Sequence, residues 1–329
     1  MKITFLTKYP IMKNGANLYS PGASARLRVI SPALELIKFG HQVSITTIHN
    51  EQSSIKFEND SDLYILSKIT NPKHLNQIAS FFELNKDKRL IIDICDNRFE
   101  MDIYHALFVK LVALSAAVFC NSVAMSKIIS KYSTHQAIEI LPEPIEGEQL
   151  IRKELDPENV RLLWFGHQDG LFQLKKNYQQ IQSLSQIRSL HLVTAPTNDV
   201  LLWLDQINNS SKNRLPLIFS PWSINGLRNA ASISDISILP GSNDSFWLTK
   251  SPNRLLQSLW YGLRVAAFPF DSYLNYKDHI CLNKDIEKAI LNSIYSHPES
   301  ECMNMLNSTF SNVAIGKSWN DSINNTRRQ

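Results

Sequence analysis

Lys250-Ser-Pro-Asn-Arg-Leu-Leu-Gln-Ser-Leu-Trp-Tyr-Gly-Leu-Arg-Val-Ala-Ala-Phe-Pro269 is the stretch that decides the fold class. Its pattern predicts a helix followed at once by a buried strand, because apolar residues first recur at helical spacing and then form a continuous run. Ser251 is typical of an N-cap, Pro252 fits the first helical position, and Gly262 can end the helix in a left-handed conformation. Arg254 then falls in the first turn, where the helix macrodipole disfavours a cation unless an anion binds there. Phosphate is the anion that a helix N-terminus and an arginine commonly bind together. The alternative is that Arg254 turns into solvent.

The same alternation of strands and helices runs along the whole chain. A loop is expected from Lys8 to Ala23, followed by a helix that begins near Ser24 and restarts at the cap-and-proline pair Ser31-Pro32. Repeated β-α alternation implies parallel sheets covered by helices on both faces. The apolar runs predict buried strands at Lys2–Thr7, Gln42–Ile48, Leu63–Leu66, Leu90–Ile94, Val118–Cys120, Ala137–Leu141, Leu162–Phe165, Leu190–Val193, Leu217–Phe219, Ile236–Leu239 and Val265–Phe268.

The length of the chain, 329 residues, favours two domains over one hydrophobic core. The proline-containing segment from Pro142 to Pro157 breaks the alternation and is interpreted as a linker. We therefore predict an N-terminal domain over residues 1–148, a second domain over 149–303, and a tail over 304–329 that packs back on the first domain. Two such domains are expected to bind a ligand in a central cleft, at the carboxyl ends of their strands.

Composition indicates an ordinary globular protein, with 43% apolar and 19% charged residues. A formal net charge of +4 is too small to argue for nucleic acid, so no nucleic-acid partner is expected. The four cysteines form no close pair and no metal-ligand spacing, so no bound metal is expected. Cys95 and Cys120 sit in apolar runs and are expected to be buried thiols of a reducing cytosol. The first seven residues are only strand-length and are not interpreted as a signal peptide, and the longest apolar run, Leu111 to Cys120, is too short to cross a bilayer.

Several of these stretches, in this order, resemble the GT-B glycosyltransferases, specifically the retaining, family-4-like group (glycosyl transferases group 1) that uses activated sugar donors. The resemblance covers nearly the whole chain. It implies two Rossmann-like domains facing a central cleft, the first on the acceptor side and the second binding a nucleotide sugar. The residues that carry it are Met1–Thr7, Phe39–Val43, Ala117–Ser122, Leu163–Gly166, Ser234–Pro240 and Lys250–Val265.

The chain also departs from this family, which implies a divergent member. The family commonly has two glutamates that frame the donor site, and by register they fall on Thr249 and Gln257. The amide of Gln257 can still bond the donor ribose, although without charge assistance. Many members carry an Arg and a Lys after the first donor-domain strand, where this chain offers His167, with Lys175 and Lys176 farther on.

The donor site is expected at the start of the Ser251–Gln257 helix and at the end of the first donor-domain strand. Backbone N–H groups of Ser251 and Asn253, with the Arg254 guanidinium, would hold the donor phosphate as negative charge builds on the leaving oxygen. The alternative is an exposed helix face. The expected donor-binding residues are Gly166, His167, Ser251, Asn253, Arg254 and Gln257.

Two further stretches are candidates for the acceptor side. In Gly22–Arg28, small residues allow close backbone approach, so Ser24 and Arg26 are expected to contact acceptor or phosphate, whereas Arg28 is interpreted as an ordinary surface arginine.

At the end of the strand Leu90–Ile94, Asp96 and Asn97 could orient an acceptor hydroxyl, and Asp96 could act as a base if its pKa is raised. The alternative is that Asp93 or Asp96 caps the following helix. In the family that the chain resembles, the departing phosphate is thought to take the acceptor proton, so that an enzymatic base is unnecessary.

We therefore expect a retaining, metal-independent glycosyltransferase, hexosyltransferase-like, with candidate catalytic residues Arg254, His167 and Asp96. It would need no cofactor besides its nucleotide-sugar substrate. It would act on a glycan or lipid-linked acceptor in bacterial surface polysaccharide or glycoconjugate synthesis, in the cytoplasm or peripherally at the inner membrane face. Two alternatives stay open: a nucleotide-sugar epimerase, and a non-catalytic GT-B-like binding subunit, which the missing glutamate pair favours.

Overall fold

The computed structural model describes residues 1–15, 17–49, 54–57, 60–133, 137–210, 213–296 and 302–326, without the side chains of residues 245 and 246. The chain forms two compact units that are not contiguous in sequence. Unit 1 consists of Met1–Pro144, Thr249–Ser251 and Asn307–Gln329, and unit 2 of Ile145–Leu248 and Pro252–Leu306. The predicted tail therefore divides between the units after Leu306, and its last three residues lie outside the described part.

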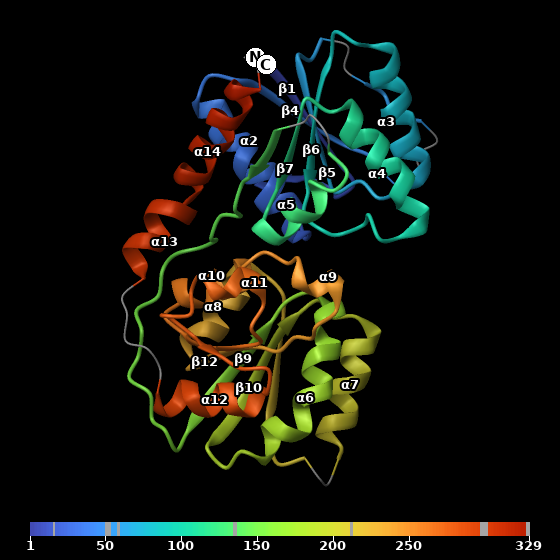
Figure 1. The fold of residues 1–329 in the computed structure, drawn as a ribbon. Helices are drawn as coiled ribbons and strands as arrows, with labels where there is room; N and C mark the ends of the chain where they lie inside the picture. Colours follow the sequence, from blue (N-terminus) through green and yellow to red (C-terminus); the bar gives the residue numbers. More distant parts are fainter. Residues whose placement is uncertain are drawn as a thin grey trace. The chain divides into compact units, whose positions relative to one another are not determined.

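Unit 1 is built on a six-stranded parallel sheet in the order β4-β1-β5-β6-β7-β8 (Figure 1). Its central strands are buried over most of their length, as their continuous apolar runs predict. The strands are β1 (Lys2–Thr7), β4 (Gln42–Thr47), β5 (Leu63–Ser67), β6 (Arg89–Ile94), β7 (Ala117–Cys120) and β8 (Ala137–Ile140).

Helices cover both faces of this sheet, because successive strand residues point to opposite sides. Leu66 and Ile92 pack in the core under α3, α4 and α5, whereas Ile65 and Ile91 pack in the core under α2 and α14. Figure 1 shows these two layers within unit 1. The helices are α1 (Ala23–Ala25), η1 (Arg26–Ile30), α2 (Ser31–Lys38), α3 (Pro72–Leu84), α4 (Asp102–Leu114), α5 (Val123–Ile129) and α14 (Asn312–Asn325), with α13 (Met303–Phe310) preceding α14.

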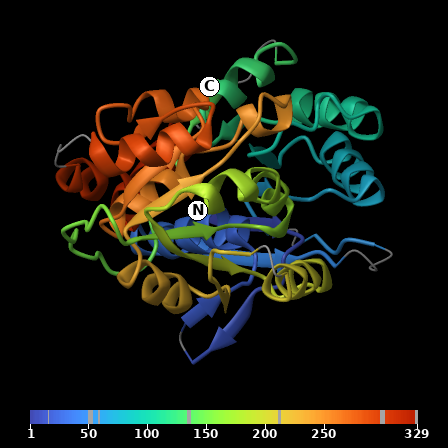
Figure 2. The same cartoon turned by 90° about the horizontal axis from the view of Figure 1, so that it is seen from below.

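The first loop and helix of unit 1 differ from the prediction. Part of the expected loop is a hairpin of β2 (Met12–Asn14) and β3 (Asn17–Tyr19), the pair of blue arrows at the lower edge of Figure 2. The predicted helix restart at Ser31 is wrong, because α1, η1 and α2 follow one another without a break and η1 is a π-helical turn. The hydroxyl of Ser31 donates to Asn312 Oδ1 at 2.6 Å, so a partner distant in sequence takes the group that would have capped a new helix.

Unit 2 repeats the architecture with a second six-stranded parallel sheet, in the order β11-β10-β9-β12-β13-β14. One face packs under α6, α7 and α12, and the other under α8 and α10. The strands are β9 (Val160–Phe165), β10 (Ile187–Thr194), β11 (Leu217–Pro221), β12 (Ile236–Leu239), β13 (Arg264–Ala267) and β14 (Cys281–Leu282). The helices are η2 (Gln168–Gly170), α6 (Leu171–Ser183), α7 (Asn198–Asn208), α8 (Ile224–Ser232), α9 (Ser245–Leu248), α10 (Asn253–Trp260), α11 (Asp271–Leu274) and α12 (Ile286–Tyr295).

The stretch from Lys250 to Pro269 is helix α10 followed by strand β13, as predicted. Gly262 has a φ of +68°, and a Cβ there would lie 2.7 Å from the backbone nitrogen of Arg152, so only glycine fits this helix stop without strain. The predicted cap is wrong, however. α10 begins at Asn253 after Pro252, without a side-chain cap, because Pro252 and not Ser251 occupies the N-cap position; the hydroxyl of Ser251 donates to the carboxylate of Glu143.

Candidate functional site

The carboxyl edge of the unit 2 sheet brings together Gly166 and Arg254. Gly166 follows β9 with a φ of +156°, and a Cβ there would lie 3.0 Å from Arg254 Nη1. Arg254 lies in the first turn of α10 and donates from Nη1 to the carbonyl of Phe165 at 3.3 Å. Its guanidinium also hydrogen-bonds the buried hydroxyl of Tyr273. Arg254 is therefore held over the end of β9 rather than extended into solvent.

The first turn of α10 is electrostatically suited to an anion. It contains no acidic residue, and the first backbone N–H groups of any helix lack intrahelical acceptors. The N–H of Leu256 is bonded to the carbonyl of Pro252 at 3.0 Å, so the N–H groups of Arg254 and Leu255 precede the first intrahelical bond. With Arg254 beside them, these N–H groups can bind a phosphate.

His167 lies next to Gly166 and is largely exposed, with 72% of its side chain accessible. Its Nδ1 accepts from the backbone N–H of Asp169 at 3.3 Å and lies 3.2 Å from the Asp169 carboxylate, so it caps the short helix η2. An exposed imidazole beside Gly166 is available to a ligand at this edge.

Gln257 is placed differently from the expected ribose contact. It is buried, its Oε1 accepts from the backbone N–H of Glu146, and its Nε2 donates to the carbonyl of the same residue, both at 2.8 Å. A carboxylate at this position could not make the second bond, because it has no donor. The amide of Gln257 thus holds the segment around Glu146.

Asp96 of unit 1 lies between two lysines. Its Oδ1 is 2.6 Å from Lys250 Nζ, and its Oδ2 contacts Lys68 Nζ, while only 7% of the Asp96 side chain is exposed. The segment Thr249–Ser251 makes two further contacts in unit 1: Ser122 Oγ donates to the carbonyl of Thr249 at 3.0 Å, and Ser251 donates to Glu143. Ser251 and Asp96 therefore belong to unit 1, whereas Asn253, Arg254 and Gln257 belong to unit 2.

Arg28 is not the surface arginine that the sequence analysis expected. Its side chain is fully buried, and its Nε donates to the Asp93 carboxylate at 3.1 and 3.2 Å. Asp93 also accepts from Ser67 Oγ at 2.9 Å, so it caps no helix. The guanidinium lies 5.1 Å from the ring of Trp319. The pair is a structural feature of the unit 1 core.

The other predicted acceptor residues lie near the same edge of unit 1. Arg26 donates from Nη1 to the carbonyls of Ser20 and Pro21 at 3.2 and 3.1 Å, so it stabilises the turn before its own helix. Ser24 is half-buried in α1. Asn97 is 4% exposed, and its Oδ1 is buried without a hydrogen-bond partner.

Sequence reasoning missed Lys68 and Lys250, which hold Asp96. Lys68 has a φ of +62°, a conformation that non-glycine residues rarely adopt. Burial and the nearby charge of Lys250 lower the pKa of Lys68 to about 8. A lysine directly after the buried strand β5 was the available signal, since polar groups at that point lie at the carboxyl edge of a parallel sheet.

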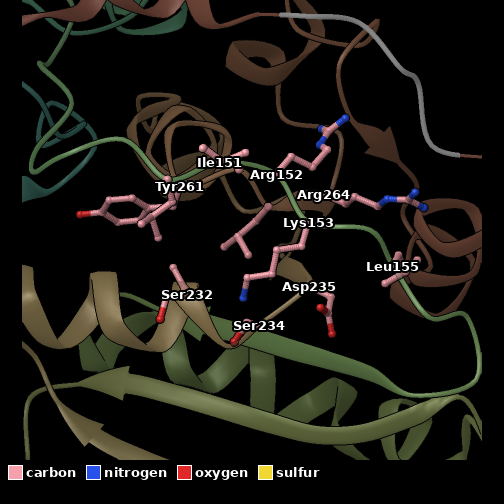
Figure 3. A pocket seen from close by; sticks show the side chains of 13 residues that line it. Ile151, Arg152, Lys153, Leu155, Ser232, Ser234, Asp235, Tyr261 and Arg264 are labelled. Atoms are coloured by element: carbon pink, nitrogen blue, oxygen red, sulfur yellow. The ribbon is translucent and has the colours of Figure 1, made fainter.

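Two cavities lie elsewhere. One, of about 70 Å³, is at the amino edge of the unit 2 sheet (Figure 3), where Asp235 is already bonded to Arg161 at 2.7 Å. The other, of about 650 Å³, is an open groove along α3 in unit 1. Among the residues that line either cavity, none is a predicted site residue.

Cys95 and Cys120 are buried free thiols, which confirms that prediction, and Cys281 and Cys302 are buried free thiols as well. In the described ranges, no group of three or more His, Cys, Asp or Glu residues could hold a metal ion. Over the same residues, no helix has the length and apolar character needed to cross a bilayer.

No family model and no curated protein sequence matches the chain. Solved structures do match. An alpha-glucosyltransferase in complex with UDP-glucose and DNA containing an abasic site has a TM-score of 0.64 at 12% identity, over 98% of this chain and 99% of that chain. The lipopolysaccharide outer core galactosyltransferase WaaB, in its apo form, has a TM-score of 0.63 at 14% identity over the same shares. TarM has a TM-score of 0.55 at 10% identity, over 79% of this chain and 54% of that chain. The chain has the GT-B fold of these proteins.

The comparisons overturn the exclusion of nucleic acid. Three of the matching structures are alpha-glucosyltransferases solved with DNA that carries an abasic site, an HMU base or an A:G mismatch. A small net charge therefore does not exclude a nucleic-acid partner for a chain of this fold, and the prediction from charge alone was wrong.

Proposed function

We propose that the protein is a glycosyltransferase that uses a nucleotide-activated sugar as donor. The observation that carries this proposal is the pairing of the Arg254 guanidinium with Gly166, where β9 ends beside the first turn of α10. Proteins with this fold over nearly the full chain length have been solved with UDP or UDP-glucose, which supports a nucleoside diphosphate at this edge. His167, exposed beside Gly166, is proposed as a further donor contact.

In the proposed reaction, the bond between the sugar C1 and the diphosphate oxygen breaks, and C1 bonds to an acceptor hydroxyl oxygen. Negative charge develops on the leaving diphosphate, where Arg254 and the first N–H groups of α10 would stabilise it. The acceptor proton would pass to the leaving phosphate oxygen, with retention of configuration at C1. Asp96 then needs no role as a base, in keeping with its place between two ammonium groups. Independence from metal and a cytoplasmic location stay predictions.

The test is a thermal-shift panel of nucleotides and nucleotide sugars, followed by an assay of slow donor hydrolysis. We expect one nucleoside diphosphate to stabilise the wild-type protein, and Arg254→Ala to remove that stabilisation and to lower hydrolysis about a hundredfold or more. Arg188→Ala is the matched control, because it removes an exposed arginine at the start of β10 in the same unit.

Four results would count against the proposal. No response to any nucleotide would contradict the use of a nucleotide-sugar donor. An unchanged response in Arg254→Ala would contradict the role of Arg254 in binding the donor phosphate. Donor binding without hydrolysis or transfer to any acceptor would favour the non-catalytic binding subunit. Conversion of the bound nucleotide sugar to its epimer would identify an epimerase.

A further inference from the structure

Four cations gather at the carboxyl edge of the unit 1 sheet. Three of them follow a strand: Lys8 follows β1, Lys68 follows β5, and Arg98 follows β6. The fourth, Lys250, belongs to the segment Thr249–Ser251 of unit 1. The charge of Arg98 acts on both Lys8 and Lys68, and the charge of Lys250 acts on Lys68. We call these four residues the unit 1 cation cluster.

The cluster has more positive than negative charge. Asp96 contacts Lys68 and Lys250, and Glu143 lies near enough to Lys68 to act on its charge. Arg28 and Asp93 neutralise each other in the core. The Cys95 thiol stays protonated, because burial raises its pKa well above the usual range. Four cations therefore face two carboxylates.

The protein holds this excess charge at a cost in solvation and backbone strain. Burial and then the charge of Arg98 lower the pKa of Lys8. Burial and then the charge of Lys250 lower the pKa of Lys68. Lys68 is also, among the described non-glycine residues, the one with a positive φ. Strained backbone and crowded like charges are typical of sites where a ligand completes the electrostatics.

Uncommitted hydrogen-bond acceptors lie at the same edge. The side-chain Oδ1 atoms of Asn97 and Asn121 are buried without a hydrogen-bond partner, and Asn121 Nδ2 donates to the carbonyl of Cys95 at 3.5 Å. Amide oxygens accept from hydroxyl groups, whereas the cations bind anionic oxygens. The edge thus offers both kinds of contact that a phosphorylated polyol or sugar would use.

We propose that the unit 1 cation cluster binds a phosphate group of the acceptor, so that the acceptor is a phosphodiester polymer rather than a neutral glycan. The role of this ligand as the acceptor rests on the function proposed above, whereas the binding of an anion at the cluster does not. Phosphodiesters occur both in nucleic acids and in phosphate-linked glycans or polyols, and the same contacts serve either source. The unit 2 edge with Arg254 would bind the donor phosphates separately.

Binding to the full chain tests this inference, with saturating UDP present to fill the donor site. The probes are a 13-nucleotide DNA, a glycerol-phosphate oligomer of similar charge and neutral maltoheptaose, each titrated at about 50 mM and about 200 mM salt. The test variant is Lys8→Gln/Arg98→Gln, which leaves the Asp96 ion pairs intact. The matched control, Lys86→Gln/Lys110→Gln, removes two exposed cations of the same unit, and the pair of Lys110 with Glu83 is about 40% exposed on both sides.

We expect a phosphate-bearing probe to bind more tightly at the lower salt, and the test variant to weaken it about tenfold while the control changes it less than about twofold. Preference for the DNA or for the glycerol-phosphate oligomer then identifies the source of the phosphodiester. Equal binding of maltoheptaose, or unchanged binding by the test variant with native circular dichroism, would overturn the proposal.

The UDP titration separates this inference from the proposed function. If the test variant lost UDP binding as Arg254→Ala is expected to, the cluster would belong to the donor and the inference would be wrong. If the wild-type protein neither bound nor hydrolysed any nucleotide sugar but still bound the phosphate probes through the cluster, the proposed function would fail and the anion site would stand.

Discussion

Replacing Arg28 by Met should destabilise unit 1 strongly and leave unit 2 unchanged. Both side chains of the Arg28–Asp93 pair are fully buried, and Arg28 Nε lies 3.1 Å from Asp93 Oδ1. At an effective dielectric constant near 20, two unit charges at this distance attract by about 5 kcal/mol. Methionine fills most of the volume, so the dominant effect is an unpaired buried carboxylate, which costs about 3–5 kcal/mol.

Hydrogen exchange followed by mass spectrometry can assign this loss to one unit, which a single melting temperature cannot do in a two-unit chain. Peptides from β5 and β6 should lose roughly a hundredfold to several thousandfold in protection in Arg28→Met, and peptides from β9 and β10 should not change. Lys110→Met is the control, because its pair with Glu83 is about 40% exposed on both sides and is worth less than about 1 kcal/mol.

A second variant distinguishes the unpaired charge from lost packing. Arg28→Met/Asp93→Leu removes both charges and should recover at least half of the lost protection, because no carboxylate is then left buried. The reasoning would be refuted if Arg28→Met changed β5 and β6 no more than Lys110→Met does. It would also be refuted if the double variant were the less protected of the two.

Three further outcomes follow from named contacts. Gly262→Ala should destabilise unit 2 by about 1–3 kcal/mol in urea unfolding, because its φ of +68° and the backbone of Arg152 both oppose a side chain; equal stability would contradict this. Gln257→Ala should lower the free energy of unfolding of unit 2 by about 2 kcal/mol, because it removes two hydrogen bonds to Glu146. Gln257→Glu should not keep the wild-type stability, because a carboxylate cannot donate the second bond. Lys68 has a pKa of about 8, so phosphate-probe binding should weaken as the pH rises from 7 to about 9, because Lys68 loses its charge. Binding near pH 8.5 should take up protons, because the bound phosphate favours the charged form of Lys68. Calorimetric heats of binding that are identical in buffers of different ionisation enthalpy would exclude this.

Local sequence predicted the elements of this fold well and their distant partners poorly. Continuous apolar runs located the strands of both sheets except β14, which is only two residues long, and Gly262 marked the end of α10 because backbone geometry there depends on one residue. The cap role of Ser251 failed because α10 begins one position later, with Pro252 at the N-cap, and nothing near Ser251 in the sequence reveals its contact with Glu143. Arg28 looked like a surface residue because nothing near it in sequence reveals Asp93.

In the candidate site too, local signals were read from the sequence and contacts with distant residues were not. Arg254 was proposed because a cation in the first turn of a helix conflicts with the macrodipole, which is a local signal, and its phosphate role stays a prediction. Gln257 was correctly seen to lack a charge, but its bonds to Glu146 depend on how the linker returns to α10. Lys68 was missed because its unusual backbone and its contact with Asp96 arise only when the sheet is assembled.

The position of α14 determines the order in which this protein can be completed during synthesis. Ile315, Trp319 and Ile323 supply part of the cover on one face of the unit 1 sheet, and Gly316 lets α14 approach Glu35 of α2 closely. The ribosome therefore makes all of unit 2 while that face of unit 1 is still partly uncovered. Unit 1 starts first and finishes last, so the nascent chain carries an exposed apolar surface for most of its translation, and chaperones have that whole interval in which to bind it.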